Sequence, residues 1–172
     1  MLFICNLTRL ALVSFIAIIA ITSSASALEK ATGAILLKVS GKVSTVNTAD
    51  CTAVFDRNLL NSFERKSIRT KTPWTNGVIH FEGFLVRDLL SAIGVESGTV
   101  RAVAINEYMI EIPIEDFLKY DVIIADHKNG TPMTVREKGP LWIIYPWDSD
   151  PELVNEIYHA RSIWQLRSLI IE

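Results

Sequence analysis

Apolar and polar residues alternate along most of the chain after residue 33, a pattern typical of strands that bury one face. β-Branched residues are frequent in these runs, and Gly, Asn and Pro separate them. The pair Asn129-Gly130 between two such runs is a strong hairpin signal. The pattern predicts strands at 34–39, 42–46, 67–72, 78–81, 100–105, 109–112, 122–126, 133–136, 141–145 and 162–171, and a strand or loop at 52–55.

Four short helices are predicted between the strands. Apolar residues at spacings of three and four, flanked by capping residues, proline or a closing glycine, mark them. Asp56 is a capping residue for the first, Gly94 ends the second, and Pro113 and Pro151 each occupy a first helical position. The helices span 57–63, 85–93, 113–118 and 151–159. Strands outnumber helices and no repeat or long linker interrupts them, so the expected architecture is α+β, one domain of mixed β-sheets with short helices.

Composition supports a single globular domain and gives no reason to expect a nucleic-acid partner. The chain has 172 residues, of which 49% are hydrophobic. Its 17 basic and 19 acidic residues leave a net charge of −2, so there is no overall basic character to attract phosphates.

The first 27 residues read as an export signal. Arg9 precedes an uncharged apolar run at 10–21, and Ala25-Ser26-Ala27 forms a small-x-small cleavage pattern. The alternative is a transmembrane anchor, but the run of about 12 residues is shorter than the ~20 that span a bilayer. No Arg-Arg pair precedes the run, so we expect the general secretory route, unfolded passage and a periplasmic domain at 28–172 without a membrane span.

Common catalytic motifs are not found in the sequence. The three histidines are scattered without other ligands at metal-binding spacing, and no nucleophile elbow, phosphate-cradling loop or Cys-x-x-Cys pair occurs. After cleavage the only thiol is Cys51, expected to be a buried apolar filler rather than a nucleophile, and its role stays open. The adjacent acids Glu115 and Asp116 are explained by a helix start, where the dipole favours negative charge.

The order of segments from Phe81 onward is more particular than a generic domain requires. It runs F-E-G-F-L-V-R-D-L-L-S-A-I-G-V, A-I-N-E-Y with I-P-I-E-D, V-R-E-K-G-P-L-W-I-I-Y-P-W and I-W-Q-L-R-S-L. Over residues 36–171 the chain resembles the oxidoreductase molybdopterin-binding domain, the fold of the sulfite oxidase catalytic domain, in a small secreted form. The segments Gly83–Gly94 and Gly139-Pro140-Leu141 carry much of this likeness.

The resemblance also implies a metal ligand that this chain lacks. Catalytic members of the family bind molybdenum through a pterin dithiolene and one cysteine, which falls in the loop before the F-E-G segment. The matching residues 70–77 contain no cysteine, and Cys51 lies about twenty residues earlier. The expected export in an unfolded state also argues against the cofactor. The resemblance implies that the cofactor is inserted in the cytoplasm, and a chain that crosses the membrane unfolded would arrive without it. We therefore expect no cofactor, with molybdopterin held without the thiolate as the alternative.

The resemblance places three loops around the former cofactor cleft, and each offers polar or aromatic side chains. The candidate ligand-binding residues are Trp74, Asn106, Tyr108, Arg136 and Lys138. Each has a plainer alternative: Trp74 as a cover over the core, Asn106 and Tyr108 as turn residues, and the two cations as a solvated hairpin end. The other tryptophans are expected in core or rim packing.

Two cations beside a glycine loop favour an anion. The sequence thus predicts a non-catalytic accessory or signalling module that binds a small anionic ligand or a periplasmic or membrane signalling protein. An interaction protein without a ligand is a further alternative.

The export signal gives the first testable prediction. Because the short apolar run ends in a cleavage pattern, the exported protein should begin at Leu28 and appear in the soluble periplasmic fraction. Mass spectrometry of the intact exported protein measures its N-terminus. An unprocessed chain beginning at Met1 and recovered in membranes contradicts the prediction.

Overall fold

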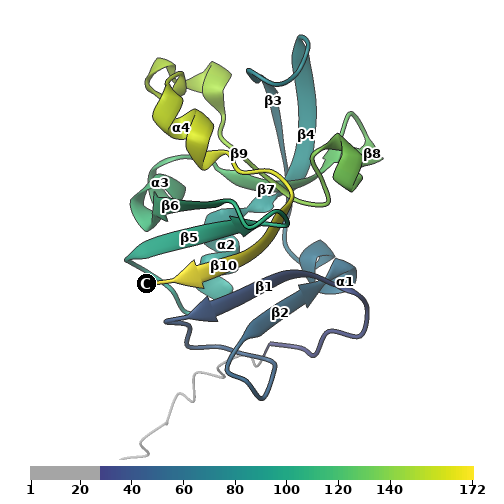
Figure 1. The fold of residues 1–172 in the computed structure, drawn as a ribbon, viewed down its shortest axis with the longest axis vertical. Helices are drawn as coiled ribbons and strands as arrows, with labels where there is room; N and C mark the ends of the chain where they lie inside the picture. The colour runs from purple at the N-terminus through teal and green to yellow at the C-terminus, as the bar shows by residue number, and fades with distance from the viewer. Residues whose placement is uncertain (1–27) are drawn as a thin grey trace, which may run out of the picture.

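The computed structural model describes residues 28–172, so the predicted export signal at 1–27 lies outside the described residues. Two five-stranded β-sheets make up most of the fold, with short helices at their ends and sides (Figure 1). The predicted α+β class is confirmed. Within residues 28–172 no helix is long and apolar enough to cross a membrane.

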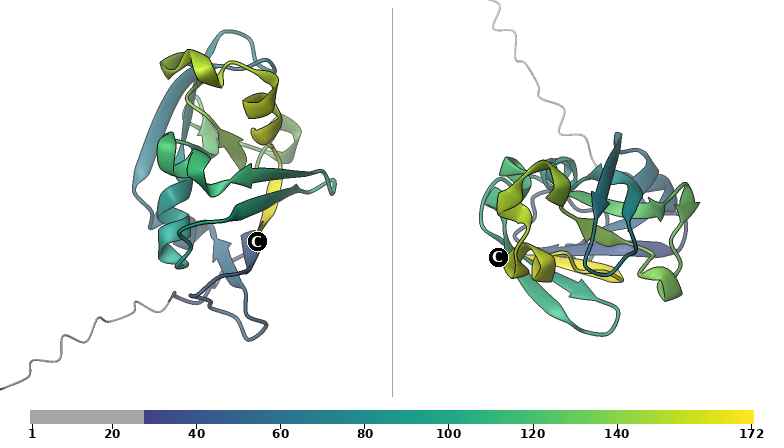
Figure 2. Two further views of the ribbon diagram at one scale, coloured as in Figure 1. Left: turned by 90° about the vertical axis from the view of Figure 1, so that its left-hand side faces the viewer. Right: turned by 90° about the horizontal axis from the view of Figure 1, so that it is seen from above.

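The first sheet carries the two ends of the domain side by side. Its strand order is β2-β1-β10-β5-β6, in which β1 and β10 are parallel and the other pairs antiparallel. The β5–β6 hairpin projects beyond the rest of this sheet in the left view of Figure 2. The strands are β1 (Ile35–Gly41), β2 (Ala53–Asp56), β5 (Thr99–Ala104), β6 (Met109–Pro113) and β10 (Leu166–Ile171).

The second sheet is antiparallel throughout. Its order is β3-β4-β7-β8, and β9 also pairs with β7. Gly83 permits β4 and β7 to approach closely, because a Cβ at this position would collide with the carbonyl oxygen of Ile124. The strands are β3 (Arg65–Lys71), β4 (Val78–Leu85), β7 (Ile123–Lys128), β8 (Thr131–Pro132) and β9 (Trp142–Ile144).

The helices are short and are positioned by caps and by burial of one face. Asp56 caps α1 as predicted, since its Oδ1 accepts a hydrogen bond of 2.9 Å from the backbone N–H of Leu59. α2 buries Val86, Leu89 and Leu90. The α-helices are α1 (Arg57–Asn61), α2 (Val86–Ala92), α3 (Ile114–Lys119) and α4 (Glu156–Arg161), and the 3-10 helices are η1 (Val135–Glu137), η2 (Trp147–Ser149) and η3 (Pro151–Leu153).

Two predicted strands are wrong because the backbone bonds elsewhere. Residues 42–46 form no strand, since the N–H groups of Ser44 and Thr45 both donate to the carbonyl of Ile93 at the end of α2. Residues 133–136 also form no strand. There the N–H of Glu137 donates to Thr134, and the chain turns into η1.

The predicted helix 151–159 is divided in two. Asn155 stands between η3 and α4, and its Oδ1 accepts hydrogen bonds from the N–H groups of Ile157 and Tyr158. A residue that caps a helix has a non-helical backbone, and that of Asn155 is extended. A continuous helix therefore cannot pass through this position.

A buried carboxylate ties α1, β3 and β7 together. Asp126 is fully buried on β7, and its oxygens lie 2.6 Å from Nη1 of Arg57, 2.5 Å from Nη2 of Arg65 and 2.8 Å from Nδ1 of His127. Burial alone raises the pKa of this carboxyl, but hydrogen bonds and charges from Arg65 and His127 outweigh burial and hold the pKa below its ordinary value. The ionised form is therefore the stable one in the fold.

This arrangement predicts a large cost for Asp126→Asn. The substitution leaves two guanidinium groups without their shared negative charge, so the free energy of unfolding should fall by about 2–4 kcal/mol. Because the folded pKa is lowered, the stabilisation is complete above the ordinary carboxyl pKa of 3.8 and is lost as the pH falls below it. Urea unfolding of both proteins between neutral and acid pH measures the difference.

Asp121→Asn is the matched control for this prediction. Asp121 pairs with Arg87 and Lys66 at the surface, where removing a charge costs about 0–1 kcal/mol. Equal losses of unfolding free energy in the two variants would show that the buried cluster around Asp126 stabilises the fold no more than a surface ion pair does.

Candidate functional site

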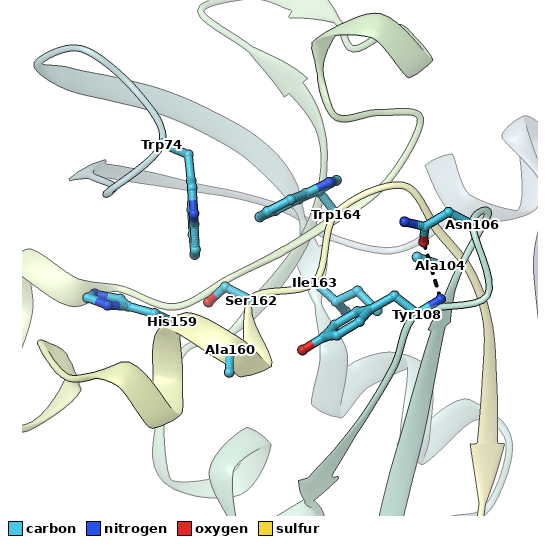
Figure 3. Close-up of a pocket in the computed structure, with 9 residues that line it drawn as sticks. All are labelled: Trp74, Ala104, Asn106, Tyr108, His159, Ala160, Ser162, Ile163 and Trp164. Atoms are coloured by element: carbon cyan, nitrogen blue, oxygen red, sulfur yellow. Dashed lines mark hydrogen bonds between the residues drawn. The ribbon is translucent and has the colours of Figure 1, made fainter.

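A cavity of about 340 Å³ opens where the tips of two hairpins approach the chain segment between α4 and β10 (Figure 3). One tip is the β3–β4 loop and the other the β5–β6 turn, so both sheets contribute to the walls. This volume lies at the lower end of the range for small-molecule sites. The pocket is lined by Trp74, Ala104, Asn106, Tyr108, His159, Ala160, Ser162, Ile163 and Trp164.

Trp74 is the centre of an aromatic cluster at one side of this pocket. Its ring centroid lies 5.2 Å from that of Trp164, 6.0 Å from Trp142, 6.1 Å from Trp147 and 5.9 Å from His159. The rings meet at 52° to 75°, which places edges against faces. Trp74 is thus both a wall of the pocket and a cover over the core.

The loop that carries Trp74 is held by its own side chains. The Oγ1 of Thr72 accepts a hydrogen bond of 3.1 Å from the N–H of Trp74 and lies 2.8 Å from the Oγ1 of Thr75. Such local bonds stabilise a turn at this point. The indole therefore projects from an ordered loop toward the pocket (Figure 3).

Asn106 and Tyr108 reach the pocket from the turn between β5 and β6. The Oδ1 of Asn106 accepts a hydrogen bond of 3.2 Å from the N–H of Tyr108, and Glu107 between them has a φ of 65°. The turn is therefore as predicted for these residues, and it also brings both side chains to the pocket (Figure 3).

The two predicted cations do not line the pocket. Arg136 is exposed on η1. Lys138 follows η1, and its ammonium lies 3.9 Å from the ring centroid of Trp164 and 5.7 Å from that of Trp142. Burial, with a smaller contribution from the charge of Lys128, lowers the pKa of Lys138. The structure therefore brings three of the five candidates together in the pocket and places Arg136 and Lys138 outside its lining, with Lys138 in contact with Trp164.

Apart from Ala104 on β5, the remaining lining residues come from the segment 159–164, which the sequence patterns do not mark as a site. Trp164 packs partly buried against the core, as the sequence predicts, and its ring also forms one wall of the pocket. His159 is, by sequence, only one of three scattered histidines. The pairing that brings this segment to β5 is long-range, so local sequence patterns do not reveal it. The closing I-W-Q-L segment of the resemblance is the one sequence signal that marks this part of the chain.

A second buried carboxylate positions α4 beside the pocket. Asp116 on α3 accepts hydrogen bonds of 2.7 Å from the hydroxyl of Tyr145 and 2.8 Å from Nη1 of Arg161, at the end of α4. Burial and the adjacent carboxylate raise the pKa of Tyr145, so its hydroxyl remains a donor. Asp116 does stand in a first helical turn, as predicted, but its contacts also tie α3 and α4 together.

The donor set of the pocket does not fit the molybdenum ligation that the resemblance implies. Among the described residues the only thiol is that of Cys51, which precedes β2 in the first sheet and is not a lining residue. The prediction that Cys51 is buried is wrong, because its loop has left-handed backbone geometry, with φ 56°, and leaves the side chain exposed. Residues 28–172 hold no cluster of three or more His, Cys, Asp or Glu side chains arranged for a metal ion.

Comparisons with known proteins identify the fold. Residues 29–149 match the family model described as the oxidoreductase molybdopterin binding domain. The solved structure of the sulfane dehydrogenase SoxCD from Paracoccus pantotrophus is similar, with a TM-score of 0.59 and 19% sequence identity over 78% of this chain. The match covers 37% of the SoxCD chain, so this protein spans little more than a third of that length. No curated protein sequence matches the chain.

The family match extends from the residues before β1 to the end of η2 and thus includes both hairpins that form the pocket. The SoxCD likeness, at its low identity, concerns the fold alone. Because the family model covers well over half of the sequence, the chain belongs to the oxidoreductase molybdopterin-binding domain family.

Proposed function

We propose that this protein is a secreted periplasmic module that binds a ligand or a partner protein without catalysing a reaction. The observation that carries the proposal is the position of Trp74. In the segment where the resemblance expects the metal-binding cysteine, this chain presents an indole that packs against four other aromatic rings. The pocket is retained, but the group that would ligate the metal is replaced by a packing and recognition surface.

The side chains around the pocket are suited to binding rather than to covalent chemistry. The hydroxyl of Ser162 donates a hydrogen bond of 2.7 Å to the carbonyl of Tyr158, so it is not directed at an imidazole that could act as its base. The ring of His159, which also lines the pocket, packs edge-on against the indoles of Trp74 and Trp147. Folds are reused for new functions when the residues at the site change, and this pocket differs from the family pattern in that way.

The competing function is a molybdopterin-dependent oxidoreductase that holds its cofactor without the thiolate. Family membership favours it, and the name of the SoxCD structure describes a dehydrogenase. A cofactor held without the thiolate would depend on contacts to the pterin alone. Direct measurement of metal and pterin separates the two proposals.

The occupant expected from the sequence is a small anion or a signalling protein. Arg136 remains available for either, because it is exposed on η1 close to Lys138. A guanidinium at the surface recognises carboxylates and phosphates through two parallel hydrogen bonds.

The absence of a thiolate predicts little molybdenum in the purified protein. Protein isolated from a molybdenum-replete host should hold far less than one metal atom per chain and should turn over neither sulfite nor sulfoxides. Elemental analysis and pterin fluorescence measure this. Near-stoichiometric metal with activity supports the oxidoreductase instead, and Cys51→Ser then tests the remaining thiol.

The aromatic cluster predicts that Trp74→Ala impairs both recognition and stability. Loss of a partly buried indole that contacts four rings should lower the free energy of unfolding by about 2–3 kcal/mol. Among screened small anions, pterins and nucleotides, it should also abolish the thermal shift of any that stabilises the wild type, together with capture of partners from periplasmic and membrane extracts.

Two further variants control for this loss. Trp74→Phe keeps an aromatic ring in the cluster and should retain most of the stability. Arg136→Ala should unfold within about ±0.5 kcal/mol of the wild type, since the side chain is exposed. If all three variants keep every ligand and partner, the pocket has no part in recognition.

A further inference from the structure

We propose that the pocket between the two hairpins takes an uncharged, ring-bearing ligand with hydrogen-bond acceptors, such as an aromatic amide, rather than an anion. This inference rests on the proposed function, in which the same pocket is the ligand site. It differs from the expectation drawn from Arg136 and Lys138, because the structure places both cations outside the lining.

The first support is the charge around the pocket. None of the nine lining residues carries a permanent charge. The charged residues next to them in the chain are already neutralised, since Arg161 lies 2.8 Å from Asp116 and Arg167 lies 2.9 Å from Glu107. An anion in this pocket would give up its hydration without gaining a partner of opposite charge.

Lys138 is a cation in contact with a wall of the pocket, and its position argues against a role as an anion receptor. Its ammonium lies over the ring of Trp164, whose indole forms a wall of the pocket, whereas Lys138 itself is not a lining residue. An ammonium over an indole face is already stabilised by the ring quadrupole. An anion would therefore have to draw this group away from the indoles of Trp164 and Trp142.

The second support is the shape of the walls. Trp74 and Trp164 meet at 67° with centroids 5.2 Å apart, so they form a corner rather than a parallel slot. Tyr108 lies across from Trp74, and His159 lies below Trp74 (Figure 3). A ring placed in this corner has an aromatic face on one side and an aromatic edge on the other, which is the arrangement that aromatic groups prefer.

The third support is the set of free hydrogen-bonding groups. The Oδ1 of Asn106 accepts from Tyr108, which leaves the Nδ2 amide of Asn106 as a donor without a partner among residues 28–172. Tyr108 is 49% exposed, and within these residues its hydrogen bond to Asn106 is made by the backbone N–H, which leaves the hydroxyl free for a ligand. These two neutral donors, one at each end of the Tyr108 side of the pocket, suit hydrogen-bond acceptors on the ligand (Figure 3).

The test uses two probes of the same size and ring that differ in charge, nicotinamide and nicotinate. At about pH 7.5 nicotinate is fully ionised, whereas nicotinamide is neutral and keeps the carbonyl acceptor. Nicotinamide should bind at least about tenfold more tightly, measured by chemical-shift titration of the full-length mature protein. Benzamide and benzoate repeat the comparison without the ring nitrogen.

Variants locate the binding and control for folding. Asn106→Ala and Tyr108→Leu should each weaken nicotinamide binding about tenfold, since each removes a donor or an aromatic wall. Met109→Ala is the matched control, because Met109 is exposed on the same hairpin but does not line the pocket. It should leave the affinity unchanged.

Each outcome decides between ligand classes. Tighter binding of nicotinate, lost in Lys138→Gln, overturns the neutral ligand and leaves the proposed ligand-binding function in place. If neither probe, inorganic phosphate nor a free pterin shifts the resonances of the lining residues, the ligand site itself is refuted. Equal effects of Met109→Ala and Tyr108→Leu would place the binding outside the pocket and overturn the inference.

Discussion

The two sheets depend on one another through Trp142. This side chain is fully buried, its indole N–H donates to the carbonyl of Ser162 at 3.0 Å, and its backbone pairs with that of Trp164. Its ring also contacts Phe81 of β4 and Trp74 of the β3–β4 loop. An indole with its donor satisfied can be buried at little polar cost, so the largest side chain of the core can stand where the sheets meet. The segment before β10 is held there, and that segment is the floor of the pocket.

The pocket therefore follows from the way the fold closes, whereas its chemistry follows from a few loop residues. The bridge between Trp142 and Trp164 and the hydrogen bond from the N–H of Ile143 to the carbonyl of Ile163 hold the segment between α4 and β10 against β9. Neither contact involves position 74, and Trp74 adds an aromatic corner beside them. Loops placed on a rigid scaffold are where a family changes its function.

Two buried carboxylates hold the outer elements of the fold against its core. Asp126 contacts Arg57 and Arg65 from α1 and β3, and Asp116 contacts Tyr145, just after β9, and Arg161 of α4. Each carboxylate is paired, so neither is left as an uncompensated buried charge. The β3–β4 hairpin and α4, which bring Trp74 and His159 to the pocket, are thus each tied to the core at one end.

Local signals in the sequence are enough to define the class of the fold and most of its elements. Alternation, capping at Asp56 and the Asn129-Gly130 turn involve neighbouring residues only, and the structure confirms a strand, helix or turn at each. The lack of a cysteine in the pocket loop is also plain from the sequence. The strand predictions for 42–46 and 133–136 are wrong for two different reasons. The backbone of the first segment bonds to the end of α2, far away in the sequence, and that of the second turns into a short 3-10 helix. Alternation of apolar and polar residues reveals neither arrangement.

The set of residues that share the pocket depends instead on long-range contacts. Trp74, Asn106 and Tyr108 stand in loops that the resemblance places near a cleft, but Trp164 and His159 join them through long-range pairing. Lys138 stands shortly before β9 in the chain, yet its ammonium lies over Trp164 because η1 ends at this residue in a left-handed conformation that turns the side chain there. Side-chain direction at such a turn is set by packing against the rest of the fold, and the sequence alone does not specify it.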